Sequence, residues 1–203
     1  GQSKIKLITL AQIGEILATY SEICPESAAI SHRGAPLFAP TRSVSAPPSK
    51  SYLHREIIAA MLSCSDLCLD AKELSDDIIA TYEAVKIISN HTNCSALGNL
   101  ESSIVSSDDK LILECKESGS TLRFLLPIVA ALGLNAEFKL TGRLRERPMQ
   151  QLISQLERHG ASITISDSGS ISISASSSHI TPGEYNFANP ESSQYITGLL
   201  FAL

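Results

Sequence analysis

Apolar residues recur every three or four positions in six stretches of the chain, which is the spacing of one buried helix face. One predicted helix spans residues 13–20, and the others begin near residues 50, 75, 121, 149 and 190. Shorter segments between them alternate apolar with polar side chains and are bounded by turn-forming residues, which is typical of strands. The predicted strands cover residues 4–10, 41–45, 66–70, 102–106, 111–115, 136–140, 163–165 and 171–173.

The order of these elements repeats along the chain. From residue 50 onward, helix, strand, helix and two strands occur twice, and a further helix follows. This order predicts an α/β (α+β) fold made of a duplicated unit, with a third copy begun. Pro127 is expected to bend its helix. The last helix is expected to be capped by Asn189, with Pro190 at its first position and Leu199 and Leu200 on its apolar face.

Composition and charge narrow the class of protein. The chain has 203 residues, of which 43% are hydrophobic, enough to bury a substantial core. The net charge of -5 argues against a broad nucleic-acid-binding face. The sequence lacks a signal-peptide pattern and any apolar run near the roughly 20 residues of a membrane span, so we expect a cytoplasmic protein without membrane contact. Five cysteines without paired CxxC spacing do not indicate a zinc site, and no metal ligand is assigned.

The stretch Pro47-Pro48-Ser49-Lys50-Ser51 places two hydroxyls and a cation where a helix begins. Proline disfavours the interior of a helix and serine is a good N-cap, so the helix is expected to start near Lys50. Its first turn would carry unpaired N–H groups and a partial positive charge, with Arg55 one turn further along. The stretch therefore predicts a site for phosphate or carboxylate. An ordinary capped helix with solvated cations explains it equally well.

Three further segments share this chemistry. Residues 117–123 place small residues and Arg123 at a second predicted helix N-terminus, residues 142–148 carry three arginines before a helix, and Ser192-Ser193-Gln194 opens the last helix. An ordinary strand-to-helix turn and an exposed charged turn remain alternatives for the first two. The chain lacks both a GK[ST] phosphate loop and a GxGxxG pattern, which disfavours nucleotide binding. Four such segments together predict a small anionic ligand.

These motifs, in this order, resemble the 5-enolpyruvylshikimate-3-phosphate synthase family. The matching patterns are Pro-Ser-Lys50-Ser51-x-x-x-Arg55, Glu-Ser-Gly119-Ser-Thr-x-Arg123, Arg143-x-x-Glu-Arg147-Pro148 and Ser192-Ser193-Gln194. The resemblance runs from about residue 40 to the C-terminus. It implies transfer of the enolpyruvyl group of phosphoenolpyruvate to shikimate 3-phosphate with release of phosphate, without metal or organic cofactor. It also implies two domains, each of three βαβαββ units, with the ligands in the cleft between them.

The resemblance implies substrate-binding roles for a set of residues in this chain: Lys50, Ser51, Arg55, Gly119, Arg143, Ser192, Ser193 and Gln194. Lys50 would bridge both substrates and is the expected catalytic residue. Ser51 and Arg55 would hold the hydroxyls and carboxylate of shikimate 3-phosphate. Its phosphate would lie against Ser192 and Ser193.

The remaining positions concern the sugar ring and the second substrate. Gln194 would lie along the ring of shikimate 3-phosphate. Gly119 and Arg143 would face phosphoenolpyruvate, with Arg143 pairing its charge. Arg123 and Arg147 are expected to support the pocket. Glu117 stands where many members have Asn, so an amide contact is expected to differ.

The resemblance covers only the first part of the family. Residues 41–203 are expected to form a truncated N-terminal domain of about two βαβαββ units and the start of a third, and residues 1–40 an extension of unknown role. The second domain, which carries the acid/base groups, is expected as a missing partner, so this fragment is expected to be inactive. The alternatives are a UDP-N-acetylglucosamine enolpyruvyltransferase-like enzyme and a non-catalytic anion-binding domain. Ser-Ser-Gln in the last helix favours the shikimate enzyme.

Overall fold

A mixed sheet of four strands and its two helices make up residues 111–174. The computed structural model describes residues 3–6, 49–65, 74–92, 110–174 and 180–203. In chain order this part contains β2 (Leu111–Lys116), α4 (Gly119–Leu132), β3 (Ala136–Leu140), α5 (Gln150–Arg158), β4 (Ser162–Ile165) and β5 (Ile171–Ser174). The strand order is β2-β3-β5-β4, with β2 parallel to β3 and the other pairs antiparallel. The arrangement is one complete βαβαββ unit, and the predicted helices and strands of this region are confirmed.

The strand pairing shifts one boundary of the predicted repeat. The sequence pattern places 111–115 at the end of the first unit, but β2 pairs in parallel with β3 and is joined to it by α4. Parallel strands need such a crossover, so β2 begins the second unit. Side chains alternate along β2, with Leu111, Leu113 and Cys115 buried and Ile112 and Glu114 exposed. One face of the sheet therefore packs on the helices.

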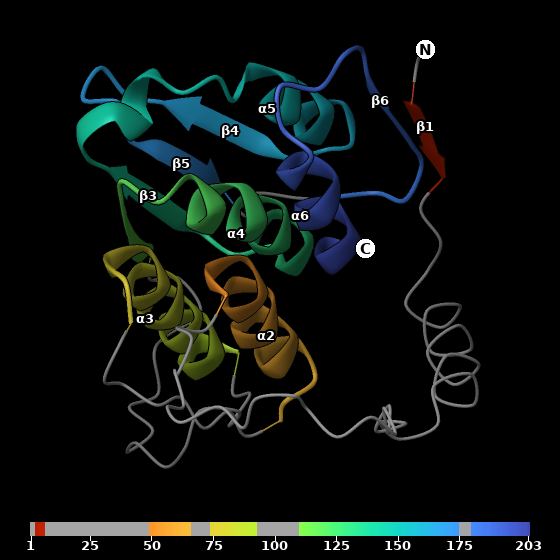
Figure 1. The fold of residues 1–203 in the computed structure, drawn as a ribbon. Coiled ribbons are helices and arrows are strands. Elements are labelled where there is room, and N and C mark those ends of the chain that lie inside the picture. Colours follow the sequence, from red (N-terminus) through yellow and green to blue (C-terminus); the bar gives the residue numbers. More distant parts are fainter. Residues whose placement is uncertain (1–2, 7–48, 66–73, 93–109, 175–179) are drawn as a thin grey trace, which may run out of the picture.

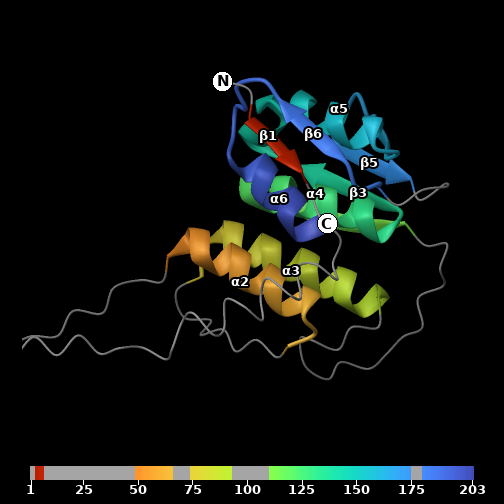
Figure 2. The same cartoon turned by 90° about the vertical axis from the view of Figure 1, so that its right-hand side faces the viewer.

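Two helices precede this unit and pack beside it. They are α2 (Lys50–Leu62) and α3 (Asp76–His91), and they confirm the helices predicted to begin near residues 50 and 75. The two contact each other, and α3 also contacts β2 and α4 (Figure 1, Figure 2). Their buried residues join the core of the sheet unit. The helix predicted at 13–20 and the strands predicted at 41–45, 66–70 and 102–106 lie outside the described residues.

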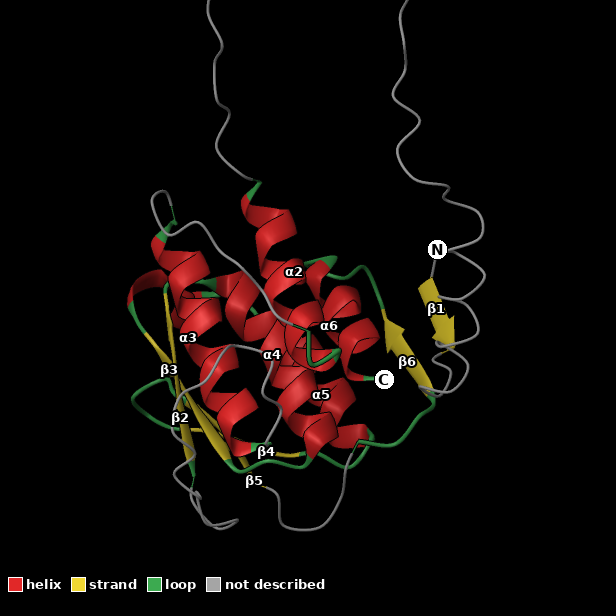
Figure 3. Cartoon of the chain, turned by 90° about the horizontal axis from the view of Figure 1, so that it is seen from below, coloured by secondary structure: helices red, strands yellow, loops and turns green. Residues whose placement is uncertain are grey.

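The C-terminal part contains a strand that the sequence pattern missed. β6 (Glu184–Phe187) pairs antiparallel with β1 (Ser3–Lys6), and the helices lie between this pair and the four-stranded sheet (Figure 3). Buried Tyr185 and Phe187 alternate with exposed neighbours, but a strand of four residues gives too short a pattern to distinguish from a loop.

The last helix starts later than predicted. α6 spans Gln194–Ala202 with Ser193 as its N-cap, so Asn189 and Pro190 precede it by about one turn. Asn189 instead adopts a left-handed conformation with φ 51°, which asparagine tolerates better than most residues. The predicted apolar face is also partly wrong, because Leu199 is buried but Leu200 is 55% exposed.

Pro127 and Gly198 explain how closely α4 and α6 approach. Pro127 has no N–H, so the carbonyl of Arg123, one turn earlier in α4, lacks its usual helical donor. A Cβ added at Gly198 of α6 would lie 2.2 Å from that carbonyl oxygen and 3.1 Å from Cγ of Pro127. Any larger residue at 198 would push the helices apart. The proline thus sits at a helix contact that requires glycine on the opposite side.

No helix in the described ranges is long and apolar enough to cross a membrane.

Candidate functional site

Neither α2 nor α6 is capped by the side chain of its own N-cap residue. Their N-cap residues, Ser49 and Ser193, make no capping hydrogen bond with their hydroxyls. At α4, the Oγ of the N-cap Ser118 accepts from one first-turn N–H, that of Thr121, at 3.2 Å. First-turn N–H groups carry partial positive charge and attract anions. Each of these three helix ends therefore offers backbone donors to an anionic ligand.

Lys50 forms an ion pair with Asp77 across the first turns of α2 and α3. The Lys50 side chain is 52% exposed and that of Asp77 is 28% exposed, so solvent and ligands reach the pair. An ion pair with this exposure contributes little to folding, roughly 0–1 kcal/mol. Lys50 is thus held at the surface of the site by a carboxylate that an anionic ligand would have to compete with.

Arg55 joins α2 to α6. Its Nη1 donates to Oγ and O of Ser51, at 2.6 Å and 2.7 Å, and its Nη2 donates to Oγ1 of Thr197 at 3.4 Å. The guanidinium also stacks on the ring of Phe124, 5.2 Å from its centroid. These contacts fix a cation that the sequence pattern placed beside Lys50. They bring Ser51 and Arg55 together as predicted, on the side of α2 that faces α6.

Arg123 and Gln194 connect the first turns of α4 and α6. Nη1 of Arg123 donates to Oε1 of Gln194 at 3.0 Å, and Nε2 of Gln194 donates to Oγ of Ser120 at 2.7 Å. The Arg123 guanidinium also lies over the ring of Tyr195, 5.7 Å from its centroid. Both groups of the Gln194 amide are therefore engaged, which fixes its orientation.

Gly119 lies where two guanidiniums meet. A Cβ added there would be 2.8 Å from Nη1 of Arg147 and 3.2 Å from Nη1 of Arg123. The absence of a side chain lets these cations approach the first turn of α4. The structure thus brings Gly119, Arg123 and Arg147 together, and the supporting role of the two arginines stays a prediction.

The segment after β3 forms a short 3-10 helix, Gly142–Glu146, where a charged turn was predicted. Gly142 has φ 53°, and a Cβ there would overlap the carboxylate of Glu117. The carboxylate that replaces the amide expected in the family thus packs against this turn. Arg143 is exposed and forms no side-chain hydrogen bond or ion pair with any described residue. The role expected for Arg143, facing phosphoenolpyruvate, stays a prediction.

The two serines of the last motif differ in their surroundings. Ser192 is half-buried, and its Oγ accepts from the N–H of Gln194 at 3.2 Å. Ser193 is exposed, and its hydroxyl forms no hydrogen bond within the described part of the chain. Both precede α6 instead of lying in its first turn. The hydroxyl of Ser193 is therefore accessible to solvent at this helix end.

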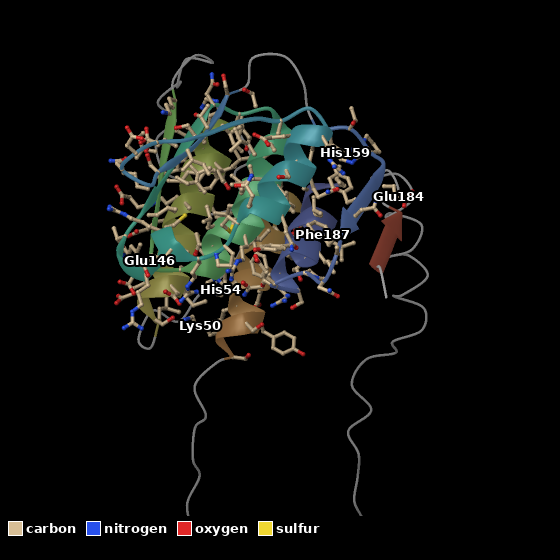
Figure 4. The ribbon with its side chains drawn as sticks, turned by 90° about the horizontal axis from the view of Figure 1, so that it is seen from above. Lys50, His54, Glu146, His159, Glu184 and Phe187 are labelled. Atoms are coloured by element: carbon tan, nitrogen blue, oxygen red, sulfur yellow. The ribbon has the colours of Figure 1, made fainter. Side chains whose placement is uncertain are left out.

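Several residues of the site escaped the sequence analysis: Asp77, Ser120, Thr197, and a buried hydrogen-bonded set of His54, Thr81 and Thr121. Asp77 is recognisable as an acid in the first turn of α3, but its pairing with Lys50 depends on the tertiary packing of two helices. His54 lies one turn after Lys50 in α2 (Figure 4). The pKa of His54 is lowered to about 4, mainly because the ring is buried and secondly because the positive charge of Lys50 is near. His54 is therefore neutral at pH 7.

The chemistry of the site suits anions better than metals. Within the described ranges, no three His, Cys, Asp or Glu side chains are placed to hold a metal ion. The groups that converge are guanidiniums, an ammonium, hydroxyls and first-turn N–H donors. Such donors bind phosphate and carboxylate oxygens.

Comparison with known proteins decides the family. A family model described as EPSP synthase (3-phosphoshikimate 1-carboxyvinyltransferase) matches residues 40–203. The chain belongs to the EPSP synthase family. The 3-phosphoshikimate 1-carboxyvinyltransferase of Clostridium kluyveri is 35% identical over 165 residues, which are 79% of this chain and 37% of the relative. That of Methanocorpusculum labreanum is 31% identical over 166 residues, 78% of this chain and 38% of the relative.

A solved structure agrees at the level of the fold. The EPSP synthase of Acinetobacter baumannii superposes with a TM-score of 0.51 and 20% identity, covering 78% of this chain and 37% of that one. The predicted fold class is confirmed. The chain spans little more than a third of the length of the EPSP synthase relatives it matches.

Proposed function

We propose that this chain supplies the part of a 3-phosphoshikimate 1-carboxyvinyltransferase that binds shikimate 3-phosphate. The observation that supports this most is the linkage of three helix N-termini: Arg123 joins α4 to Gln194 of α6, and Arg55 joins α2 to Thr197 of α6. The residues of the family motifs thus meet at neighbouring helix ends. Residues 41–203 would form the N-terminal domain, and residues 1–40 an extension.

The proposed ligand has two anionic groups, a phosphate and a carboxylate, and ring hydroxyls. Ser192 and Ser193 before α6 suit the phosphate, because helix N-termini and hydroxyls donate to phosphate oxygens. Arg55 suits the carboxylate, since a guanidinium makes forked hydrogen bonds to it. Gln194 would lie along the ring, with its amide oriented by Arg123 and Ser120. Lys50 would face both this ligand and phosphoenolpyruvate.

Phosphoenolpyruvate would be held by fewer groups of this chain. Gly119 opens the first turn of α4, and Arg123 and Arg147 bring positive charge to it. Arg143 would add a further cation from its exposed position. Transfer of the enolpyruvyl group also requires a proton to leave the attacking hydroxyl and phosphate to depart, which calls for a positioned acid and base. We propose that the second domain of the family supplies these groups.

Calorimetric titration of the chain tests the proposal. Shikimate 3-phosphate is expected to bind alone and weakly, and phosphoenolpyruvate alone to bind more weakly still. Tighter binding of phosphoenolpyruvate in the absence of shikimate 3-phosphate would reverse the assignment of the two substrates. Binding of UDP-N-acetylglucosamine in place of shikimate 3-phosphate would favour the other enolpyruvyltransferase. If no substrate binds, a non-catalytic domain becomes the better interpretation.

A rate measurement separates binding from catalysis. Mixing the chain with both substrates is expected to release no phosphate above the uncatalysed rate, because the proposed acid/base groups lie on the second domain. Phosphate release that is abolished by Lys50→Ala would show that this chain carries a complete site.

A further inference from the structure

A buried line of hydroxyl groups lies beneath the candidate site. Nδ1 of His54 is 2.7 Å from Oγ1 of Thr81, which is 2.6 Å from Oγ1 of Thr121. Oγ1 of Thr121 in turn donates to Oγ of Ser118 at 2.7 Å. The four residues are at most 1% exposed and come from α2, α3, α4 and the α4 N-cap. The line therefore crosses all three helices.

The number of protons available fixes which group donates and which accepts in each hydrogen bond of the line. Each hydroxyl has one proton to donate. Thr121 uses its proton toward Ser118, so Thr81 must donate to Thr121, and His54 must donate to Thr81 from Nδ1. His54 is thus the Nδ1–H tautomer, and its Nε2 is an acceptor that is buried without a hydrogen-bond partner. Protonation would place an N–H there with nothing to receive it, next to the cations Lys50 and Arg55.

The line meets the site at Asp77. Oγ1 of Thr81 and Oγ1 of Thr121 also lie 3.2 Å and 3.4 Å from the backbone carbonyl oxygen of Asp77. Each hydroxyl therefore shares its one proton between the shorter bond along the line and this longer one. The carboxylate of the same residue pairs with Lys50. A single residue in the first turn of α3 therefore holds α2 through its side chain and α4 through its backbone.

We propose that the buried line from His54 through Thr81 and Thr121 to Ser118 is a positioning element, which fixes the first turns of α2, α3 and α4 so that Lys50 and Gly119 face one ligand. The inference rests on the proposed function for its ligand. Thr81 and Thr121 contact no ligand in this scheme and act through the helix ends. Their methyl groups fill space, but their hydroxyls determine how the helices are spaced.

Isosteric substitutions separate the hydroxyls from the packing. Thr81→Val and Thr121→Val remove the hydroxyl at nearly constant volume, whereas Thr81→Ser and Thr121→Ser keep it. Thr92→Val is a control for the loss of a threonine hydroxyl away from the site, because Thr92 is exposed and its hydroxyl donates to the carbonyls of Ile88 and Ser89 at the far end of α3. The dissociation constant for shikimate 3-phosphate is expected to rise about tenfold in each of the first two valine variants. It should change less than about twofold in the serine variants and in Thr92→Val.

A measurement without ligand keeps this inference separate from the proposed function. Residual dipolar couplings of backbone amides report the orientation of α2 relative to α4, which should change in Thr81→Val and Thr121→Val but not in the serine variants. If the unmodified chain fails to bind shikimate 3-phosphate, the proposed function is wrong while these couplings still test the positioning element. Unchanged couplings in both valine variants would overturn it.

The native chain offers a test that needs no folded variant. Nitrogen chemical shifts distinguish the two neutral tautomers of histidine, and His54 is expected to carry its proton on Nδ1. A proton on Nε2 would reverse or break the line of donors and would overturn the inference.

Discussion

The amide of Gln194 is held at both of its polar atoms, by Nη1 of Arg123 at 3.0 Å and by Oγ of Ser120 at 2.7 Å. Its orientation is therefore set before any ligand arrives. A side chain that is already ordered loses less conformational entropy on binding, which favours affinity. The same contacts join α4 to α6, so Gln194 contributes both to the shape of the site and to the folded state.

Arg123 and Gln194 are expected to be energetically coupled. Gln194→Ala and Arg123→Met each remove the hydrogen bond between them, and the double variant removes no further part of it. The free energies of unfolding should therefore be non-additive by about 1 kcal/mol or more. Urea unfolding of the four proteins measures this coupling. Strict additivity would mean that the contact contributes nothing to stability.

Lys50→Ala is expected to separate binding from folding. Shikimate 3-phosphate affinity should fall below detection, because Lys50 is the cation proposed to face both substrates. The free energy of unfolding should change by less than about 1 kcal/mol, since the ion pair with Asp77 is open to solvent. Lys110→Ala provides a matched control, because Lys110 forms a similarly exposed pair with Glu137 at the sheet. A large fall in melting temperature with intact affinity would make Lys50 structural.

Two glycines should respond in opposite ways to substitution by alanine. At Gly198 the new methyl group would meet the backbone carbonyl of Arg123 at 2.2 Å, and α4 and α6 would have to separate. We expect Gly198→Ala to lose about 1–3 kcal/mol of stability. At Gly119 the new methyl group meets the ends of the Arg147 and Arg123 side chains, which can move aside. Gly119→Ala should keep its melting temperature but bind phosphoenolpyruvate less well, and the reverse pattern in thermal scans and titrations would contradict the packing described.

His54 should make stability depend on pH in mildly acidic solution. Burial lowers its pKa from 6.5 to about 4 in the folded chain, with Lys50 and Arg55 adding to the effect and Asp77 opposing it. Between these values the unfolded chain binds a proton that the folded chain does not. Stability is therefore fully present above about pH 6.5, falls as the pH is lowered, and is reduced by about 3 kcal/mol once the pH drops below 4.

His54→Asn supplies the control for this prediction. The asparagine amide can donate near the place of Nδ1–H but does not titrate. The difference in urea midpoint between the two proteins should shrink from pH 7 to pH 4. A constant difference across this range would show that His54 titrates normally in the fold.

Long periodic segments were predictable from the sequence, whereas short segments and buried polar contacts were not. β2 follows directly from its alternation, because one of its faces lies on the core, and α4 follows from a long apolar segment, because most of its residues are buried. β6 has only four residues, and its partner strand β1 lies at the other end of the chain. The start of α6 was misplaced because Asn189 and Pro190 also fit a helix cap, and only the observed backbone of Asn189 excludes it.

The motif residues of the site were predictable as anion-binding groups, but their connections were not. The cations and small residues at 50–55 and 119–123 stand at helix starts, which local sequence reveals. Thr81 and Thr121, by contrast, lie on buried helix faces where a threonine resembles any small core residue. Their hydrogen bonds to each other join residues 40 positions apart, and no local pattern encodes such a contact.

The pairing of β1 with β6 has a consequence for the order in which the chain folds. Ser3 lies opposite Phe187 and Lys6 opposite Glu184, so the pair closes a loop that contains nearly every other element. During synthesis β1 emerges before the four-stranded sheet and β6 after it. Contacts within that sheet unit are nearer in sequence and form faster than a closure of this length. The pairing of β1 with β6 is therefore expected to form after the four-stranded sheet.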